Sequence, residues 1–419
     1  MTKNQSDRET DVLIIGAGAS GLMAAAAVAR EGKKCLVVDR MPRAGSKILV
    51  TGKGRCNITN HCEIETVIRN TPGNGSFLYS ALHGFSPSDI MEYFESRSVP
   101  LKTERGGRVF PVSDKASDVR DALLVDALAQ GVSFAYNTRI CGLLEKDGVI
   151  MGAFSRDREF PAKKVILACG GASYPQTGSD GSGYGLAKHC GHTVIPPRGA
   201  LTGLETREKW PYGLSGLTLK NIRFSLHEKD KTLFTEAGEL LFTHFGISGP
   251  VVLTASRFLP GFGKGVVRGR IDMKPALDFE KLDARVRRDF LEYDMKQFKN
   301  SLDMLLPKVM IPVAVNLSGI HPEKQVNQIT KEERQGLVRL MKSLELEIMG
   351  PRPIGEAIVT TGGISVTEVH PGSMESKLVK GLYFCGEILD VDALTGGFNL
   401  TIAFSTGHLA GKKAAEALE

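Results

Sequence analysis

A short apolar segment, a glycine-rich turn and an alanine-rich segment follow one another near the N-terminus of this 419-residue chain. Residues 12–15 read Val-Leu-Ile-Ile, as in a fully buried parallel strand, and run straight into residues 16–21, Gly-Ala-Gly-Ala-Ser-Gly. A helix is predicted to about Arg30, and a second strand over Cys35–Val38 ends at Asp39. Because Asp39 lies 18 residues beyond the last glycine (39 minus 21), the segment matches a dinucleotide-binding βαβ unit.

Each glycine of this turn has a physical role in such a unit. Gly16 allows the tight turn, Gly18 lets backbone N–H groups approach a pyrophosphate, and Gly21 lets helix and strand pack closely. The helix N-terminus then attracts the phosphate charge. Asp39 is expected to accept hydrogen bonds from both hydroxyls of an adenosine ribose and to repel a 2′-phosphate, so NADP is disfavoured in this pocket.

A second sequence motif that predicts cofactor binding lies nearly four hundred residues beyond the first. Residues 381–390 read Gly-Leu-Tyr-Phe-Cys-Gly-Glu-Ile-Leu-Asp, and residues 395–407 bring a Gly-Gly turn followed by an apolar helix. The N-terminal signal alone does not choose between NAD and FAD, whereas the pair predicts one long cofactor held by both ends of the chain. We therefore expect FAD. The helix that starts near Gly397 is expected to point its positive end at the flavin N1–C2=O edge.

Residues 43–60 form a candidate cofactor-lining loop because they are rich in glycine and in hydrogen-bond donors. Arg55 and Asn57 stand between glycines and a Thr-Asn pair, and an ordinary exposed loop is the alternative. Arg108 is either a solvated turn residue or an anion contact near the active site. His244 lies in an aromatic-rich turn, where it either reaches a substrate or has a structural role. These four residues are the catalytic candidates.

Residues 164–171 form a further buried strand that ends in paired glycines. The next segment, residues 174–185, has glycines at 178, 181, 183 and 185 before it enters a helix. This spacing predicts a loop that lies against something flat or phosphorylated.

The domain organisation follows from a change of character at Pro196-Pro197. The expected FAD-binding domain is α/β and discontinuous, covering residues 1–195 and 356–419. An inserted domain covers 196–355, with a β-rich part over 196–275 and a helical part over 276–350. Arg285, Arg287 and Arg288 in the helical part are a conceivable RNA-binding patch, but nearby acids and the lack of interleaved aromatic residues favour a solvated face.

Composition limits the class of protein. Hydrophobic residues make up 42% and charged residues 24%, as in globular proteins, and no signal peptide or membrane span is apparent, so we expect a cytoplasmic protein. The seven scattered cysteines lack a C-x-x-C pair and are expected to be reduced thiols. No metal site or hydrolytic arrangement is expected. The net charge of +6 would help to attract an anionic substrate without requiring nucleic acid.

With these segments in hand, the chain resembles the bacterial HI0933-like flavoproteins, also called YhiN- or BaiN-like NAD(P)/FAD-dependent oxidoreductases. The resemblance covers nearly the whole length. It rests on residues 16–21, 52–60 (Gly-Lys-Gly-Arg-Cys-Asn-Ile-Thr-Asn), 107–111 (Gly-Arg-Val-Phe-Pro), 242–250 (Phe-Thr-His-Phe-Gly-Ile-Ser-Gly-Pro), 361–364 (Thr-Gly-Gly-Ile) and 381–407.

This resemblance implies a Rossmann-type FAD domain related to those of glutathione reductase and fumarate reductase, with a β-rich plus helical insertion. Two departures stand out: Cys169 replaces the usual Thr of an Ala-Thr-Gly motif, and Glu387 replaces the Asp of the wider superfamily. The implied FAD contacts are Gly16, Gly18, Ala19, Ser20, Gly21, Asp39, Arg40, Lys47, Gly52, Gly54, Arg55, Cys56, Asn57, Thr59, Ile140, Ala168, Gly170, Gly171, Gly386, Glu387, Gly397, Phe398, Asn399, Leu400 and Thr401.

The expected activity is a two-step hydride relay. NADH or NADPH reduces a tightly but non-covalently bound FAD, which passes the hydride to a small organic acceptor with an activated C=C bond. Three alternatives remain: an oxygen-using amine or aminoketone oxidase, a flavin-dependent RNA-modifying or RNA-binding protein, and a redox-inert flavoprotein. Nucleic acid and membranes are not expected partners. The sequence indicates neither the substrate, the proton donor nor the oligomeric state.

Overall fold

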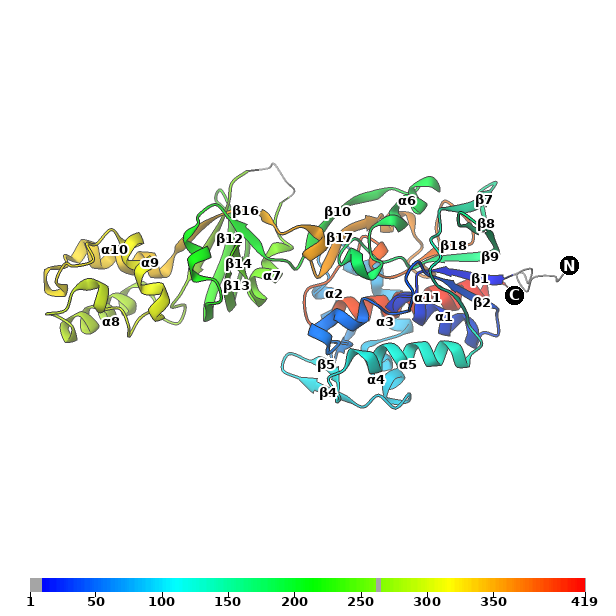
Figure 1. Ribbon diagram of the computed structural model, residues 1–419, viewed down its shortest axis with the longest axis horizontal. Coiled ribbons are helices and arrows are strands. Elements are labelled where there is room, and N and C mark those ends of the chain that lie inside the picture. The colour runs from blue at the N-terminus through cyan, green and yellow to red at the C-terminus, as the bar shows by residue number, and fades with distance from the viewer. Residues whose placement is uncertain (1–9, 261–264, 419) are drawn as a thin grey trace. The chain divides into compact units, whose positions relative to one another are not determined.

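The computed structural model describes residues 10–260 and 265–418, and it divides into two compact units (Figure 1). The terminal unit comprises Met1–Gly199 and Ile354–Glu419, so it contains both ends of the chain. The inserted unit comprises Ala200–Pro353. Within the described residues, no helix combines the length and the hydropathy needed to cross a membrane. All seven cysteines are free thiols.

A seven-stranded sheet forms the centre of the terminal unit. Its strands follow the order β6-β2-β1-β9-β8-β7, and β18 pairs with β9 next to the β8–β7 hairpin. The strands β6, β2, β1, β9 and β18 are mutually parallel, and the near-continuous apolar sequences of β1, β2 and β18 follow from burial on both faces. The bounds are β1 (Thr10–Ile15), β2 (Cys35–Val38), β6 (Ser133–Ala135), β7 (Gly142–Lys146), β8 (Val149–Phe154), β9 (Glu159–Leu167) and β18 (Leu382–Phe384).

Two helices from opposite ends of the chain pack against each other beside this sheet. They are α1 (Ala19–Arg30) and α11 (Phe398–Glu416), which lie together in Figure 1. A Cβ atom at Gly407 would lie 2.4 Å from the carbonyl oxygen of Ser20, and one at Gly411 would lie 2.3 Å from that of Ala24. Only glycine fits at this helix–helix contact, because real Cβ atoms do not approach backbone oxygen so closely.

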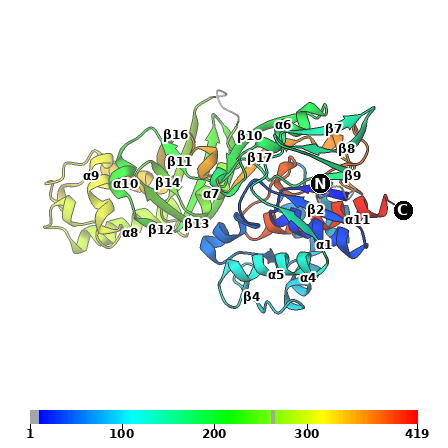
Figure 2. The same cartoon turned by 45° about the vertical axis from the view of Figure 1, so that its right-hand side comes forward.

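The rest of the terminal unit surrounds this core. Asp126 of α5 accepts hydrogen bonds from Tyr93 of α4 and Arg97, and Figure 2 shows the two helices side by side. A small antiparallel sheet has the order β3-β5-β4, and β10 pairs with β17. The bounds are β3 (Thr59–Asn60), β4 (Leu101–Glu104), β5 (Arg108–Pro111), β10 (Val194–Ala200), β17 (Val359–Ile364), α2 (Ile64–Arg69), α3 (Tyr79–Gly84), α4 (Pro87–Glu95), α5 (Ala116–Ala129) and α6 (Ser182–His189).

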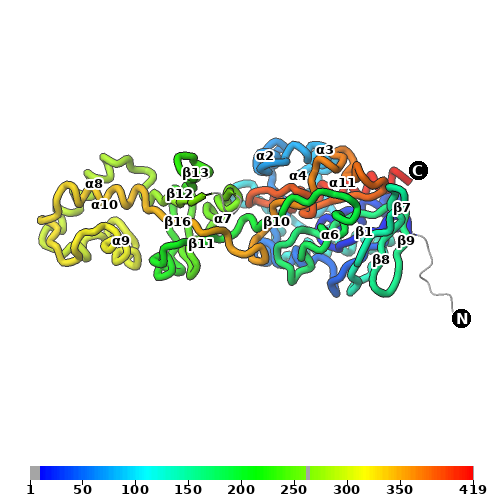
Figure 3. The backbone as a smooth tube through the Cα atoms, turned by 90° about the horizontal axis from the view of Figure 1, so that it is seen from above, coloured from blue at the N-terminus to red at the C-terminus, as the bar shows by residue number. Residues whose placement is uncertain are grey.

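The inserted unit consists of a closed barrel and a group of helices. The barrel order is β11-β14-β13-β12-β15-β16, with β16 pairing back to β11. Alternate residues such as Phe224, Ile271 and Leu346 point inward and are almost fully buried. In Figure 3, α8 and α10 run together. The bounds are β11 (Leu204–Thr206), β12 (Thr218–Glu228), β13 (Lys231–Thr243), β14 (Gly246–Ser248), β15 (Val267–Asp272), β16 (Leu344–Pro351), α7 (Pro250–Ser256), α8 (Phe279–Glu292), α9 (Ile311–Ser318) and α10 (Lys331–Lys342).

Two local features differ from the sequence-based expectations. Pro196 and Pro197 lie inside β10, and the terminal unit continues to Gly199, four residues beyond the predicted end at residue 195. Among the described strands β10 pairs with β17 alone, and a strand with a free side tolerates the missing N–H of proline. The helical part ends at Lys342 rather than near residue 350, because Leu344–Pro351 forms the barrel strand β16. Its buried Leu344, Leu346 and Ile348 alternate with more exposed residues, which is the strand period.

Candidate cofactor site

A long pocket lies within the terminal unit. Its empty volume is about 1390 Å³, including the solvent at its mouth. The lining includes residues that follow four parallel strands. Asp39, Gly16 and Ala168 come directly after β2, β1 and β9, and Glu387 comes three residues after the end of β18. These strands lie in the order β2-β1-β9-β18, so the pocket crosses the carboxyl ends of the parallel sheet, where open α/β sheets bind their ligands.

The N-terminus of α1 faces this pocket without a side-chain cap. Gly16 has φ +112°, and a Cβ atom there would lie 2.4 Å from the carbonyl oxygen of Ala168. A Cβ atom at Gly21 would lie 1.9 Å from the carbonyl oxygen of Gly16, whereas one at Gly18 would meet nothing within 4 Å. Gly16 and Gly21 thus serve the fold itself, and Gly18 leaves open space where a ligand can approach the backbone.

Asp39 organises the glycine turn. Its carboxylate accepts hydrogen bonds from the backbone N–H groups of Ala17 at 2.6 Å and Met41 at 2.7 Å, one on each oxygen. Burial raises the pKa of Asp39, and these two hydrogen bonds, together with the charge of Arg40, oppose the rise. Each carboxylate oxygen has a second lone pair, so Asp39 can still accept hydrogen bonds from a ribose.

Arg40 holds the glycine-rich loop of residues 174–181. Its guanidinium forms an ion pair with Asp180 and donates a hydrogen bond to the carbonyl oxygen of Pro175 at 3.3 Å. Gly178 and Ser179 of this loop line the pocket. The resemblance implies a direct cofactor contact for Arg40, and in the structure this residue lines the pocket while both of its Nη atoms donate to the loop.

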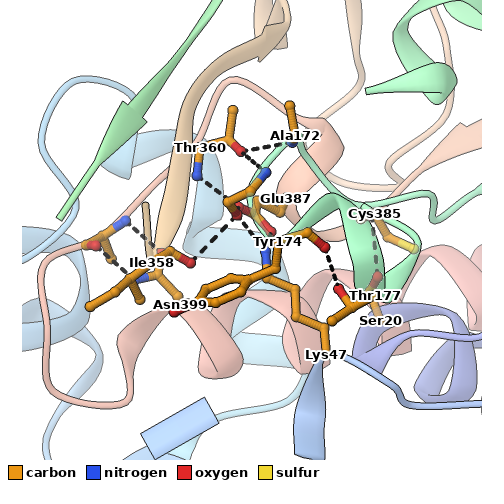
Figure 4. Close-up of polar contacts among 12 residues, drawn as sticks. Ser20, Lys47, Ala172, Tyr174, Thr177, Ile358, Thr360, Cys385, Glu387 and Asn399 are labelled. Atoms are coloured by element: carbon orange, nitrogen blue, oxygen red, sulfur yellow. Dashed lines mark hydrogen bonds and ion pairs between the residues drawn. The ribbon is translucent and has the colours of Figure 1, made fainter. Parts of the chain in front are cut away.

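A polar network lies at the end of the pocket beyond β18 (Figure 4). The Lys47 ammonium donates to Glu387 Oε2 at 2.5 Å and to Ser173 Oγ at 2.7 Å. Glu387 Oε1 accepts from Ser173 Oγ at 3.0 Å and from the backbone N–H of Thr360 at 2.7 Å. Thr360 Oγ1 in turn accepts from the N–H groups of Ala172 and Ser173. Four segments distant in sequence therefore meet at one carboxylate.

The N-terminus of α11 borders the same end of the pocket. Its first turn follows Gly397, which has φ +102°, and no side chain caps it. Asn399 lines the pocket and closes the preceding loop, because its carboxamide accepts from the N–H of Ala393 at 2.9 Å and donates to the Ala393 carbonyl at 2.7 Å. Thr59 and Thr401 share a hydroxyl–hydroxyl hydrogen bond of 2.7 Å, which joins the loop of residues 52–60 to this helix.

The arrangement fits a dinucleotide that carries phosphate groups in its middle. Two uncapped helix N-termini offer backbone donors to one pocket, and anions are favoured at such positions. Ser179 Oγ in the pocket wall is buried and has no hydrogen-bond partner among the residues that the structure describes. Unsatisfied buried polar atoms are costly, and a bound ligand would satisfy them.

The structure separates the expected cofactor contacts into two groups. The contacts that line the pocket are Gly16, Gly18, Ala19, Ser20, Asp39, Arg40, Lys47, Ile140, Ala168, Gly170, Glu387, Asn399 and Leu400. The contacts outside the lining are Gly21, Gly52, Gly54, Arg55, Cys56, Asn57, Thr59, Gly171, Gly386, Gly397, Phe398 and Thr401.

Several members of the second group support the site from behind. A Cβ atom at Gly171 would lie 2.4 Å from Thr360 Oγ1, one at Gly386 would lie 2.4 Å from Ser20 Oγ, and one at Gly397 would lie 2.3 Å from the Thr59 carbonyl. These glycines allow neighbouring segments to approach the pocket wall. Sequence reasoning did not name Arg139, which lines the pocket, whereas Arg43, which also lines it, belongs to the predicted cofactor-lining loop of residues 43–60. An arginine in a loop after a strand was the available signal.

The four catalytic candidates lie in different places. Arg55 donates to Asp114 at 2.7 Å and pairs with Glu104, and these two acids raise the pKa of Arg55. Arg108 is exposed and donates to the Arg105 carbonyl at 3.1 Å. His244 belongs to the inserted unit, where its ring packs edge-on against Phe245. None of the four, Asn57 included, is in the lining of the pocket.

Comparison with known proteins assigns the family. The family described as HI0933-like protein Rossmann domain matches residues 10–413. The 3-dehydro-bile acid delta(4,6)-reductase of Clostridium scindens is 34% identical over 412 residues, which cover 96% of this chain and 98% of that protein. A ribosomal RNA dihydrouridine synthase of Haemophilus influenzae is 30% identical over 401 residues, with coverage of 94% and 96%.

Among solved structures, a flavocytochrome c3 fumarate reductase in its open conformation aligns with a TM-score of 0.51 at 16% identity, covering 99% of this chain and 80% of that chain. This likeness supports the Rossmann-type α/β fold that the sequence predicted. The chain belongs to the HI0933-like family of FAD-dependent oxidoreductases.

Proposed function

We propose that this protein reduces a carbon–carbon double bond, activated by a neighbouring carbonyl group, in a small organic molecule. FAD is the proposed tightly bound, non-covalent cofactor, and NADH or NADPH is the proposed electron donor. When bound, FAD supplies the two-electron chemistry that connects a nicotinamide donor to an organic acceptor. The relative from Clostridium scindens, whose name describes a delta(4,6)-reductase, supports this class of reaction.

One observation carries the proposal: a single pocket crosses four parallel strand ends and meets an uncapped helix N-terminus at two places. Asp39 and Glu387 follow strands that are three strand spacings apart, roughly 14 Å. Asp39 would bind the adenosine ribose, and the N-terminus of α1 would hold the pyrophosphate. The N-terminus of α11 would then favour negative charge at the flavin end.

The first test is the visible absorption spectrum of the purified protein, followed by anaerobic titration with NADH and, separately, NADPH. We expect a yellow protein whose flavin absorption is bleached by one of the two nucleotides and recovers when an α,β-unsaturated ketone is added. A protein that stays colourless after incubation with FAD would refute the proposal. Bleaching by amines but by neither nucleotide would favour the oxygen-using amine oxidase instead.

A second candidate substrate is uridine within RNA. Two relatives named as ribosomal RNA dihydrouridine synthases favour it, since dihydrouridine is uridine with its C=C bond saturated; the second, from Escherichia coli, is 29% identical over 94% of this chain. The positive charge is also concentrated in the inserted unit, where 24 Lys and Arg face 19 Asp and Glu, leaving +5 (24 minus 19) of the total +6.

The two substrates can be separated in one assay. The reduced, FAD-loaded protein is incubated with an unmodified ribosomal RNA transcript or with a steroid enone, and dihydrouridine and saturated ketone are each quantified. Dihydrouridine formation that falls steeply with added salt would favour RNA, because binding to a polyanion releases counterions. Turnover of the enone alone would favour the small-molecule reductase.

A further inference from the structure

We propose that Lys47 and Glu387 form a charge pair whose members shift the reduction potential of bound FAD in opposite directions and so balance each other. This inference rests on the proposed cofactor but not on the proposed substrate. The two residues lie 340 positions apart, and their side chains meet at 2.5 Å in the pocket wall. They are 23% and 19% exposed, so water screens their charges only in part.

Neutral groups hold this pair in one geometry. Ser173 Oγ accepts from Lys47 and donates to Glu387, and the N–H of Thr360 donates to the same carboxylate oxygen as Ser173. Gly171 makes room for the network, since a Cβ atom there would lie 2.4 Å from Thr360 Oγ1 and 3.1 Å from Glu387 Cδ. The charged atoms are therefore positioned by several hydrogen bonds, as Figure 4 shows.

The pair lies at the end of the pocket where the proposed cofactor orientation puts the flavin. Glu387 follows β18, whereas Asp39, the proposed ribose ligand, follows β2 on the other side of β1 and β9. Asn399 and Leu400, in the first turn of α11, line the same pocket. Because Asp39 is assigned to the adenosine end, the proposed orientation puts Lys47 and Glu387 toward the flavin end of the cofactor.

Simple electrostatics predicts the effect of each charge. Reduction adds electron density to the cofactor, so a nearby cation raises the reduction potential and a nearby anion lowers it. In the intact protein the two charges largely cancel. Removing one charge leaves the other without a partner in a pocket wall that is only partly exposed to solvent, so the remaining charge has a larger effect on the reduction potential of the cofactor.

The experiment measures the reduction potential of the FAD-loaded variants by spectroelectrochemistry. Lys47→Met should lower the potential, Glu387→Gln should raise it, and the double variant should lie close to the wild type. Ser173→Ala is the matched control, because it removes a neutral member of the same network and should shift the potential less than either charge change. Lys47→Arg keeps the charge and should keep the wild-type potential.

Shifts of the reduction potential in the same direction in both single variants, or no shift in either, would overturn the proposal. Loosened packing alone would not shift the potential in opposite directions for the loss of a positive and of a negative charge. If Lys47→Met does not retain FAD, the comparison of Lys47→Arg with Lys47→Gln replaces it, and equal potentials in those two would also count against the proposal. So would loss of FAD from Lys47→Arg, since shape rather than charge would then matter. The measurement uses no nicotinamide or organic substrate, so a failed substrate assay leaves its result intact.

Discussion

The two units of the chain differ in how the space inside them is filled. In the terminal unit, backbone segments approach so closely that a single Cβ atom would collide with a carbonyl oxygen, as at Gly21 and Gly407, and the unit contains an open pocket. In the inserted unit, large apolar side chains such as Phe224 and Phe298 fill a closed core. The terminal unit thus leaves an open pocket between closely spaced backbone segments, whereas side chains fill the barrel of the inserted unit.

The largest expected effect comes from two glycine substitutions in the turn before α1. Gly21→Ala should lower both the FAD content and the stability, because its Cβ atom would lie 1.9 Å from the Gly16 carbonyl oxygen. Gly18→Ala should leave the fold intact, since its Cβ atom meets no protein atom within 4 Å, but should raise the FAD dissociation constant at least tenfold, about 1.4 kcal/mol. FAD content and urea unfolding of both variants test this contrast. Normal FAD affinity in Gly18→Ala would contradict it.

A core substitution in the inserted unit should produce the converse result. Phe224 is fully buried in the barrel, so Phe224→Ala should destabilise the protein by about 3–5 kcal/mol. The purified variant should still bind FAD in equimolar amount, because its change lies outside the terminal unit. Urea unfolding and the flavin absorbance of the same sample provide the measurement. Loss of FAD at urea concentrations below the unfolding transition would contradict the view that cofactor binding depends on the terminal unit alone.

The terminal unit should also show a pH dependence that depends on His408 in α11. Burial lowers the pKa of His408 to about 4 from 6.5, and its ring lies 4.6 Å from that of Phe85. Below pH 6.5 His408 is therefore protonated in the unfolded chain, whereas in the folded chain it stays neutral down to about pH 4. Stability should fall across this window by at most about 3 kcal/mol.

The corresponding measurement is the free energy of unfolding of the wild type and of His408→Gln at several pH values between 7 and 4. The wild type should lose more stability on acidification than the variant does. Parallel curves for the two proteins would show that other groups are responsible.

The smallest effect is expected on a surface helix of the inserted unit. Gly336 lies within α10, and a Cβ atom there would meet nothing within 4 Å. Gly336→Ala should therefore stabilise the protein by up to about 1 kcal/mol, because alanine costs less conformational entropy in a helix. A shift of the urea midpoint to higher concentration, with unchanged FAD content, is the expected result. Destabilisation would indicate that this glycine, like those of the terminal unit, serves a close contact.

Local patterns in the sequence were sufficient to predict the βαβ unit, because a buried apolar segment, a glycine turn and Asp39 lie within thirty residues. The family and the Rossmann-type fold were also predicted correctly. The strand β16 was missed, since the Lys- and Glu-rich helix α10 directly precedes it, although its period-two pattern was present.

Contacts between distant positions could not be predicted in the same way. The ion pair between Arg40 and Asp180 spans 140 positions, and the hydrogen bond of Arg55 to Asp114 spans 59. The residues next to an arginine in the sequence do not distinguish a guanidinium that faces a phosphate from one that faces a carboxylate. Its partner depends on the tertiary arrangement, which local propensity does not contain.

The glycine contacts between α1 and α11 impose an order of events on synthesis. The ribosome makes α1 long before its packing partner α11, so α1 lacks this contact until translation has passed residue 398. The barrel and its helices lie between α1 and α11 in the sequence, so they can fold before α11 has been synthesised. Nascent chains stalled before residue 398 would thus have an incomplete cofactor pocket. Flavin absorption should be found with nascent chains only when translation has passed this residue.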